Sequence, residues 1–479
     1  MIAYLRRSVN REMWKFVNKV LTGFRECFKN EAAFGLFVVI VMGLMTHTDH
    51  LGVTSIVREL SLSGASYTAM VHFFRAKSWV VEKITAAWIG AIKRSGCAIK
   101  EGERHIMAAD GVKEGQEGKK MPGVKKLHQE SENSSKGSYI FGHLFGGLGI
   151  LAGNAAKTYS VLISCRLHDG ISAISKWAGE KDESHVVKMI KDAAAAARLI
   201  GDSILLLDRL YLTVPMLKTL KSAGRGLLSV VTKAKSNATA YLDPPPYKGR
   251  GAYPKRGKSV KVWDYFDTAK FQTDEAVMYG KKEKVSYYSI DLLWGQKLYQ
   301  KLRFVLTVID GVKSVLVSTD LTIEPMRVVQ LYCYRFRIEC SFRELKQVIA
   351  GFAYRFWSKV MPKLNRYKSN AENQTNLENV TDPKKQQLII STVNAINGYV
   401  QLSCIALGIL QLVSLLHPNE IVGRFMRTKS NAVPSEATVA DHMRKNIFSL
   451  LLFFPNLDIT AIIKSRQNPP VDDGNRDSG

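Results

Sequence analysis

The stretch Ile204-Leu205-Leu206-Leu207-Asp208 indicates the fold class, because it is a fully apolar run that ends in a carboxylate. Such a run is typical of a strand that is buried on both faces of a sheet. A predicted helix over 213–223, ended by Gly224, follows it, and a second apolar strand is predicted over 227–232. The alternation of strand, helix and strand predicts an α/β fold with helices packed on a sheet.

The residues before this stretch extend the same sheet. Strands are predicted at 105–110, 139–151 and 159–167, and a helix at 184–200 that begins at the N-cap Ser184. The whole of 101–237 therefore predicts a mixed sheet covered by helices. Asp110 and Asp208 each end an apolar strand. Strand ends can lie side by side at one edge of such a sheet, where catalytic groups collect.

The rest of the chain divides by pattern into further regions. Residues 238–325 predict a β-rich antiparallel insertion, which begins with a Pro- and Lys-rich loop. Its strands are predicted at 260–266, 276–279, 285–293, 302–309 and 314–319. Residues 366–467 predict a C-terminal helical region after a polar linker, and 468–479 a disordered tail.

Residues 1–100 predict helices at 13–28, 32–45, 53–62, 67–74 and 79–92. The region holds 14 basic and 6 acidic residues. A compact basic helical segment is typical of a DNA-binding region, of which a helix-turn-helix is one form. The alternative is a helical packing domain whose charges face solvent. In the C-terminal region, the apolar stretch 388–416 predicts helix, partly as a hairpin, and a possible dimer contact.

Composition limits the class of protein. The chain has 479 residues, 46% hydrophobic and 23% charged, which excludes collagen, coiled-coil arrays and disorder across the whole chain. The formal charge of +26 predicts a polyanionic partner, most simply nucleic acid and less simply an anionic membrane. The apolar run 32–45 is shorter than the roughly 20 residues that span a bilayer. Six cysteines without CxxC spacing give no sign of a zinc site. A soluble intracellular protein is expected.

A third acid lies in a predicted long helix from Met326 to about Val348. At about 100° per residue, one face of this helix within an arc of roughly 60° carries Tyr332, Arg335, Glu339 and Lys346, and Glu344 falls elsewhere. The segment 326–365 holds eight basic and two acidic residues. A carboxylate flanked by cations can bind a metal while its neighbours hold phosphate oxygens. The alternative is an amphipathic helix with ordinary Glu–Lys pairs; the two strand-end acids favour the first interpretation.

The spacing Tyr332-x2-Arg335-x3-Glu339-x6-Lys346 resembles the Tyr-Arg-Glu-Lys (YREK) signature of bacterial insertion-sequence transposases with a DDE triad. Asp110 in Ala-Ala-Asp-Gly is similar to the first acid of that family, and Asp208 in Leu-Leu-Asp-Arg to the second. The long interval between Asp208 and Glu339 accommodates the β-rich insertion that the group places there. The resemblance covers roughly 100–365. It implies a ribonuclease-H-like catalytic core, with residues 326–365 returning to it after the insertion.

The resemblance also implies a metal-dependent activity on double-stranded DNA. Asp110, Asp208 and Glu339 would bind two Mg²⁺ ions, for which Mn²⁺ can substitute, since hard cations prefer carboxylate oxygens. Two such ions can activate an attacking hydroxyl and stabilise the leaving oxygen of a phosphodiester. The expected activity is cut-and-paste transposition, in which terminal inverted repeats are cleaved and the freed 3′-OH attacks target DNA. A homodimer that pairs two ends, a cytoplasmic nucleoid-associated location and no membrane partner are expected.

Further DNA contacts follow from the same resemblance. Tyr332, Arg335 and Lys346 would hold phosphates, with Arg209 joining them. Trp294 or Trp263 would stack a displaced base, with core packing as the alternative for each. Apart from the resemblance, Lys119, Lys120, Lys125 and Lys126 lie in a basic, loop-like segment and are candidates for DNA backbone contact, with a solvated loop as the alternative. Lys233 and Lys235, just past the last core strand, are candidates for phosphate contact. Structural roles are expected for His105, His143 and His168, and turn or cap roles for Asp169 and Asp202.

Two rival functions remain at this stage. One is a nuclease on the same fold that hydrolyses DNA without joining it. The other is a non-catalytic DNA-binding protein derived from a transposase, which the presence of all three acids disfavours.

Overall fold

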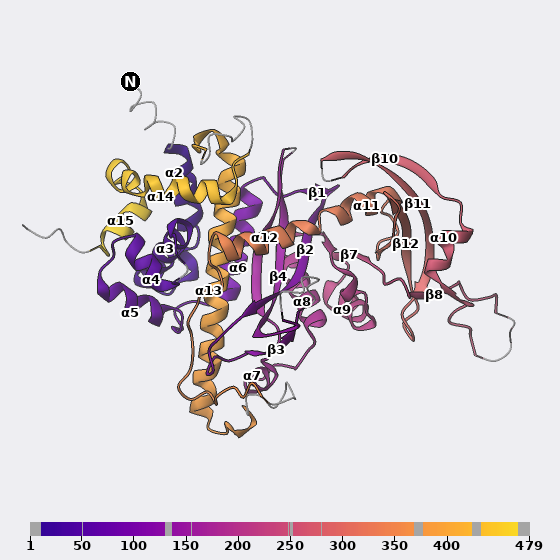
Figure 1. Cartoon of the computed structure of the whole chain (residues 1–479), viewed down its shortest axis with the longest axis horizontal. Coiled ribbons are helices and arrows are strands. Elements are labelled where there is room, and N and C mark those ends of the chain that lie inside the picture. Colours follow the sequence, from indigo (N-terminus) through magenta and orange to yellow (C-terminus); the bar gives the residue numbers. More distant parts are fainter. Residues whose placement is uncertain are drawn as a thin grey trace, which may run out of the picture.

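The computed structural model describes residues 11–49, 51–129, 137–154, 156–247, 249, 252–278, 280–367, 377–423 and 433–467. Figure 1 shows helices from both ends of the chain gathered beside a large sheet, whose far end is formed by antiparallel strands. The predicted α/β class, a mixed sheet with helical N- and C-terminal regions, is confirmed. The predicted tail 468–479 lies outside the described residues.

Thirteen described strands form one sheet. In chain order they are β1 (Lys100–Glu101), β2 (Arg104–Gly115), β3 (Lys125–His128), β4 (Tyr139–Gly153), β5 (Thr158–Leu167), β6 (Ser203–Leu206), β7 (Leu228–Lys233), β8 (Thr239–Tyr241), β9 (Ser259–Lys261), β10 (Gln272–Met278), β11 (Lys281–Trp294), β12 (Gln300–Ile309) and β13 (Val312–Ser318). The main order is β3-β4-β2-β6-β7-β13-β12-β11-β8-β9, with β5 also paired to β4.

The centre of the sheet is parallel and its outer parts are antiparallel. β6 lies between β2 and β7 and runs parallel to both. All four residues of β6 are buried, as expected for a strand covered on both faces. β13 then pairs antiparallel with β7, so the predicted insertion continues the core sheet at this edge.

The helices are α2 (Arg11–Thr22), α3 (Glu31–Thr46), α4 (Val53–Glu59), α5 (Gly64–Phe73), α6 (Val81–Arg94), α7 (Ser172–Trp177), α8 (His185–Ile200), α9 (Val214–Gly224), α10 (Tyr265–Thr268), α11 (Pro325–Cys333), α12 (Phe336–Gln347), α13 (Pro383–Leu416), α14 (Glu436–Phe453) and α15 (Asp458–Lys464). Short 3-10 helices lie at Arg25–Cys27 (η1), Arg209–Tyr211 (η2), Val262–Asp264 (η3), Leu377–Asn379 (η4) and Pro418–Glu420 (η5).

Opposite faces of the sheet carry α8 and α12. A Cβ at Gly147 of β4 would meet the Phe342 ring of α12, whereas a Cβ at the next residue, Gly146, would meet the His168 ring, which bonds to α8. Successive side chains of a strand point to opposite faces. The sheet therefore has an α12 face and an α8 face, and these names are kept below.

The apolar helix α3 is the core of the helical body rather than a surface element. It packs against α13, α14 and α15, so helices from both ends of the chain share one hydrophobic core. Burial of nearly every side chain of α3 explains why its sequence is apolar all round. The DNA-binding role expected of residues 1–100 remains a prediction.

The predicted hairpin in 388–416 is wrong, because this stretch lies in the single helix α13, which stands between the helical body and β5 (Figure 1). Trp79 and Trp88 pack directly on its glycines Gly398 and Gly408, where a Cβ would come within 2.7 Å and 2.3 Å of the indoles. Among the described helices, α13 is long and apolar enough to cross a membrane, and α14 with α15 only if the bent pair counts as one span. The apolar window of α13 is 89% buried, as in the core helix of a soluble protein.

Two more predicted elements are corrected. The strand predicted at 260–266 is only β9, after which the chain turns into η3 and α10. Here Trp263 packs on Phe266, with ring centroids 4.8 Å apart, so the apolar residues serve an aromatic cluster. The long helix predicted from 326 is broken into α11 and α12 at Tyr334 and Arg335. The amide groups of these two residues bond three residues back, to Leu331 and Tyr332, which tightens the turn and ends α11.

Candidate active site

Asp110 and Asp208 occupy equivalent positions on neighbouring parallel strands. Ala108 of β2 is in register with Leu206 of β6, and each acid lies two residues beyond that pair. The prediction that Asp110 ends its strand is wrong, because β2 continues to Gly115 by pairing with β4 after β6 has stopped. Asp110 therefore lies in the part of β2 that extends beyond the end of β6, next to Asp208.

Glu339 comes to the same place through Arg335. The Arg335 guanidinium donates Nη1 to Asp110 Oδ2 at 3.1 Å and Nη2 to Glu339 Oε1 at 2.5 Å. Arg335 and Glu339 are one turn apart at the start of α12. They therefore still share one face of the helix, as predicted, despite the break between α11 and α12. A single guanidinium thus joins the strand acid and the helix acid on the α12 face.

The charges of Asp208 and Glu339 act on the Asp110 carboxyl. Burial raises the pKa of Asp110 from 3.8 to about 6, opposed by Arg335 and the Gly111 amide and assisted by the negative charges of Asp208 and Glu339. Burial alone would lower the pKa of Arg335, but its hydrogen bond to Glu339 and the charge of Asp110 raise it above the usual value. The site holds more negative charge than one cation comfortably balances.

The two remaining signature residues have partners in the described structure. Lys346 Nζ lies 2.8 Å from Glu114 Oε2 and donates to the Lys113 carbonyl at 2.9 Å, which ties the end of α12 to β2. Tyr332 is half-buried at the end of α11 and lies close enough to affect the pKa of Arg335. An open pocket of about 420 Å³ is lined by Asp110, Glu339 and Lys346.

The donor set suits a hard cation, although the carboxylates are now bound to an arginine. In the part of the chain that the structure describes, no three His, Cys, Asp or Glu side chains are arranged to hold a metal ion. One oxygen of Asp110 and one of Glu339 are instead bridged by Arg335. Carboxylate oxygens and surplus negative charge are what Mg²⁺ and Mn²⁺ prefer, so the residues fit the implied ions by their chemistry.

A second pocket brings together two residues predicted to contact DNA. Arg209 and Trp294 line a cavity of about 260 Å³, together with Lys235. Trp294 ends β11, whereas Trp263 packs within its aromatic cluster. The cavity beside Trp294 leaves its indole open to a base, as the stacking prediction requires.

The basic segment 119–126 is held in place by the residues after α12. The Lys120 carbonyl accepts from the Ser358 amide and the Lys119 carbonyl from the Leu364 amide. Lys125 begins β3 and pairs with Asp169 at 2.8 Å, and Lys126 lies over the Tyr139 ring at 4.4 Å. Contact between DNA and Lys119, Lys120, Lys125 or Lys126 remains a prediction.

The three histidines for which structural roles were predicted are buried in the protein interior. His143 bonds to the Tyr354 hydroxyl and the Pro122 carbonyl, and burial lowers its pKa to about 4. His105 is buried in β2. His168 has a larger role than the sequence indicated, since it bonds to His185 and Asp192. Neither His185 nor Tyr211 was singled out from the sequence, because the contacts that join them come from elements far apart in the chain.

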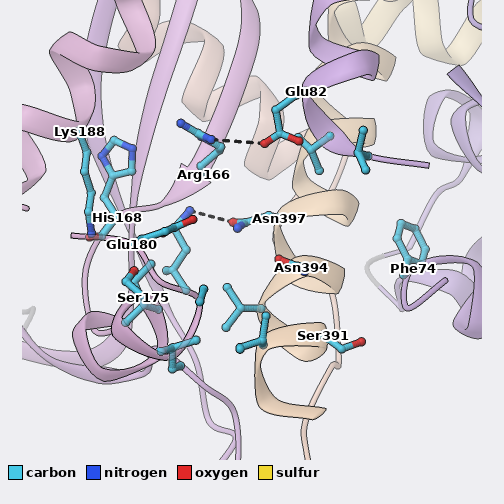
Figure 2. A pocket seen from close by; sticks show the side chains of 18 of the residues that line it. Phe74, Glu82, Arg166, His168, Ser175, Glu180, Lys188, Ser391, Asn394 and Asn397 are labelled. Carbon is cyan, nitrogen blue, oxygen red and sulfur yellow. Dashed lines mark hydrogen bonds and ion pairs between the residues drawn. The ribbon is translucent and has the colours of Figure 1, made fainter. Parts of the chain in front are cut away.

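A larger cavity of about 860 Å³ lies away from the three acids. It is bounded by α13, α6 and the segment from β5 to α8, and Figure 2 shows Arg166, His168 and Lys188 on one side and Asn394 and Asn397 on the other. Its size does not make it the candidate active site, because none of Asp110, Asp208 and Glu339 lines it.

The mixed sheet with carboxylates at its parallel centre defines the class of fold, a ribonuclease-H-like α/β protein. Residues 156–358 match the family model described as the transposase DDE domain. The matched segment contains Asp208 and Glu339, and Asp110 precedes it. The match supports a transposase. No curated protein matches the chain in sequence.

Proposed function

We propose that this protein is a DNA transposase of the Tyr-Arg-Glu-Lys group that cleaves transposon ends and transfers them into target DNA. The observation that carries the proposal is that Asp110 and Asp208 each lie two residues beyond the pair Ala108–Leu206 of adjacent parallel strands, with Glu339 joined to Asp110 through Arg335. The register of β2 and β6 and the Arg335 bridge support a common site for the three acids, which come from distant parts of the sequence. The match of 156–358 to a transposase domain supports the same conclusion.

In this proposal Asp110, Asp208 and Glu339 hold two Mg²⁺ ions, or Mn²⁺. When bound, the ions supply an activated hydroxyl and stabilise the leaving oxygen of the phosphodiester. Cations compete with Arg335 for the oxygens of Asp110 and Glu339. An arginine displaced from carboxylates presents the planar donors that suit a phosphate.

The DNA is held by residues around this edge. Tyr332, Arg335 and Lys346 contact phosphates near the cleaved end. Arg209 holds the backbone beside the pocket of Trp294, whose indole stacks a displaced base. The basic segment 119–126 extends the positive surface.

The assembly proposed is a homodimer that synapses two terminal inverted repeats in the bacterial cytoplasm, associated with the nucleoid. The C-terminal helices are the proposed dimer contact. Exposed apolar side chains on α14, Phe448, Leu452 and Phe453, offer area for such a contact.

Strand transfer tests the proposal. Precleaved ends taken from the DNA that flanks the gene are incubated with the full-length protein, Mg²⁺ and a target plasmid. Joined products that disappear in Asp110→Asn, Asp208→Asn and Glu339→Gln are expected, with Asp202→Asn as the matched control. Cleavage without joining would indicate a nuclease. DNA binding that is unaffected by the acid variants, with no cleavage by the wild type, would indicate a non-catalytic protein.

A further inference from the structure

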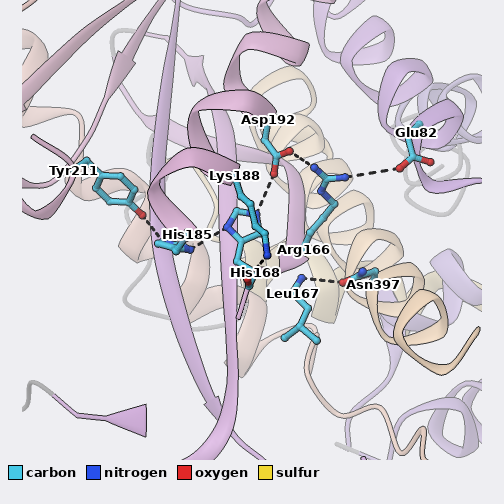
Figure 3. A network of polar contacts seen from close by, with 9 residues as sticks. All are labelled: Glu82, Arg166, Leu167, His168, His185, Lys188, Asp192, Tyr211 and Asn397. Carbon is cyan, nitrogen blue, oxygen red and sulfur yellow. Dashed lines mark hydrogen bonds and ion pairs between the residues drawn. The ribbon is translucent and has the colours of Figure 1, made fainter. Parts of the chain in front are cut away.

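A chain of buried and half-buried polar side chains runs across the α8 face of the sheet, behind the strand acids. Figure 3 shows Tyr211, His185, His168, Asp192 and Arg166 bonded in that order. The Tyr211 hydroxyl lies 2.7 Å from His185 Nε2, the two histidine Nδ1 atoms lie 3.0 Å apart, and His168 Nε2 lies 3.1 Å from Asp192 Oδ2. Arg166 pairs with the other oxygen of Asp192.

The direction of the hydrogen bonds follows from the carboxylate at one end. Burial raises the pKa of Asp192, but the His168 hydrogen bond and the Arg166 charge outweigh it and lower the pKa. An ionised Asp192 can only accept, so His168 donates from Nε2. When His168 carries only this proton, its Nδ1 accepts from His185 Nδ1, and the Tyr211 hydroxyl is then the donor to His185 Nε2. Burial lowers the pKa of His185 to about 4, in agreement with a neutral ring.

Two glycines of the sheet make room for the histidine rings. A Cβ at Gly146 of β4 would come within 2.1 Å of the His168 ring, and a Cβ at Gly111 of β2 within 3.1 Å of His185 Nε2. Interior glycines weaken a strand and often mark close approach of another group. The rings therefore lie directly on the sheet, and His185 lies against the residue that follows Asp110.

At its Tyr211 end, the row of bonded side chains contacts the backbone of Asp208. The Asp208 carbonyl accepts from the Tyr211 amide at 3.1 Å and from the Thr232 hydroxyl at 2.9 Å. Tyr211 is 3% exposed, so its ring position fixes the short helix η2 that follows Asp208. His185 thus contacts β2 beside Asp110 and, through Tyr211, the turn that carries Asp208.

The row of bonded side chains is also anchored at its His168 end, away from the acids. Lys188 donates to the His168 carbonyl at 2.8 Å, and the Leu167 amide donates to Asn397 of α13 at 2.9 Å (Figure 3). These bonds, drawn in Figure 3, fix the segment that carries His168 against α8 and α13. The chain is therefore held rigidly at the end away from the acids.

We propose that His185 and Tyr211 are positioning residues that keep Asp110 and Asp208 in register for divalent cations. The inference rests on the proposed function, because it assumes that the two acids bind metal. Neither residue needs to touch the ion or the DNA. Groups that orient metal ligands typically change metal affinity by roughly 10- to 100-fold when removed.

The test is a Mn²⁺ titration of the full-length protein, followed by electron paramagnetic resonance in the absence of DNA. Tyr211→Phe removes one hydroxyl and leaves the ring in place, and His185→Ala removes the link itself. Each is expected to weaken Mn²⁺ binding by roughly tenfold. His105→Ala is the control, because it removes another buried histidine from the strand of Asp110. It is expected to bind Mn²⁺ within about twofold of the wild type, although it loses stability.

Asp110→Asn and Asp208→Asn separate the two levels of the argument. If neither weakens Mn²⁺ binding, the metal site of the proposed function is wrong. If both do and Tyr211→Phe binds Mn²⁺ like the wild type, the positioning role is overturned while the metal site stands. If His185→Ala does not fold, Tyr211→Phe decides alone.

Discussion

Replacing Asp110 by asparagine should stabilise the metal-free protein while abolishing its proposed activity. Burial and the nearby charges of Asp208 and Glu339 raise the pKa of Asp110 from 3.8 to about 6, despite Arg335. At about 1.4 kcal/mol per pKa unit, the ionised side chain costs the folded state about 3 kcal/mol. Asparagine removes the charge but also leaves Arg335 with one carboxylate fewer, so a gain of about 1 to 3 kcal/mol is expected.

The pH dependence gives the sign of this effect. A carboxyl whose folded pKa is raised keeps its proton in the folded state up to about pH 6, whereas the unfolded chain releases it near 3.8. The wild type therefore loses stability as the pH rises between these values, and the loss is complete above about 6. Asp110→Asn lacks this loss. The difference between the two proteins should be small near pH 4 and full at pH 8.

Thermal unfolding in EDTA between pH 4 and pH 8 measures the difference. Asp202→Asn is the matched control, since Asp202 is exposed at the start of the neighbouring strand; it should change stability by no more than about 0.5 kcal/mol. An Asp110→Asn protein that is less stable than the wild type at pH 8, or a difference that does not grow with pH, would refute the reasoning.

Three further outcomes are expected. Arg335→Met removes the cation that opposes the rise in the pKa of Asp110, so the acid limb of the cleavage–pH profile should move to higher pH; an unmoved limb would contradict the pairing. Gly408→Leu forces a side chain against Trp88, where a Cβ alone would lie 2.3 Å away, and should lower the free energy of unfolding by about 1 to 3 kcal/mol or more in a denaturant titration; an unchanged midpoint would show that α13 can move aside. Trp294→Ala should weaken binding of a DNA end with an unpaired base by about 1 to 3 kcal/mol in a fluorescence anisotropy assay. If the variant binds this DNA as tightly as the wild type, Trp294 is not a DNA contact.

The central strands could be predicted because a strand that is buried on both faces has an uninterrupted apolar sequence. Residues 204–207 are apolar without interruption because β6 is covered on both faces. The position of Asp110 within β2 was not predictable, since the strand is prolonged by its pairing with β4 rather than by its own residues. The register between Ala108 and Leu206, which brings the acids together, is likewise a property of the sheet.

Other differences arise from contacts between distant segments. Tyr334 and Arg335 are ordinary helix residues, so no proline or glycine announces the break between α11 and α12. His185 is simply the first residue of α8 in the sequence, and only the fold brings it to Gly111 and Tyr211. Local pattern predicts which elements form, whereas the polar chain behind the acids depends on tertiary packing.

Anomalous diffraction from crystals of the full-length protein soaked in Mn²⁺ tests the central claim most directly. The account predicts Mn²⁺ coordinated by Asp110 and Asp208, with Glu339 released from Arg335 to complete the site. Crystals in which Mn²⁺ binds elsewhere and Arg335 still bridges Asp110 and Glu339, from a protein that cleaves DNA with Mn²⁺ in solution, would contradict it.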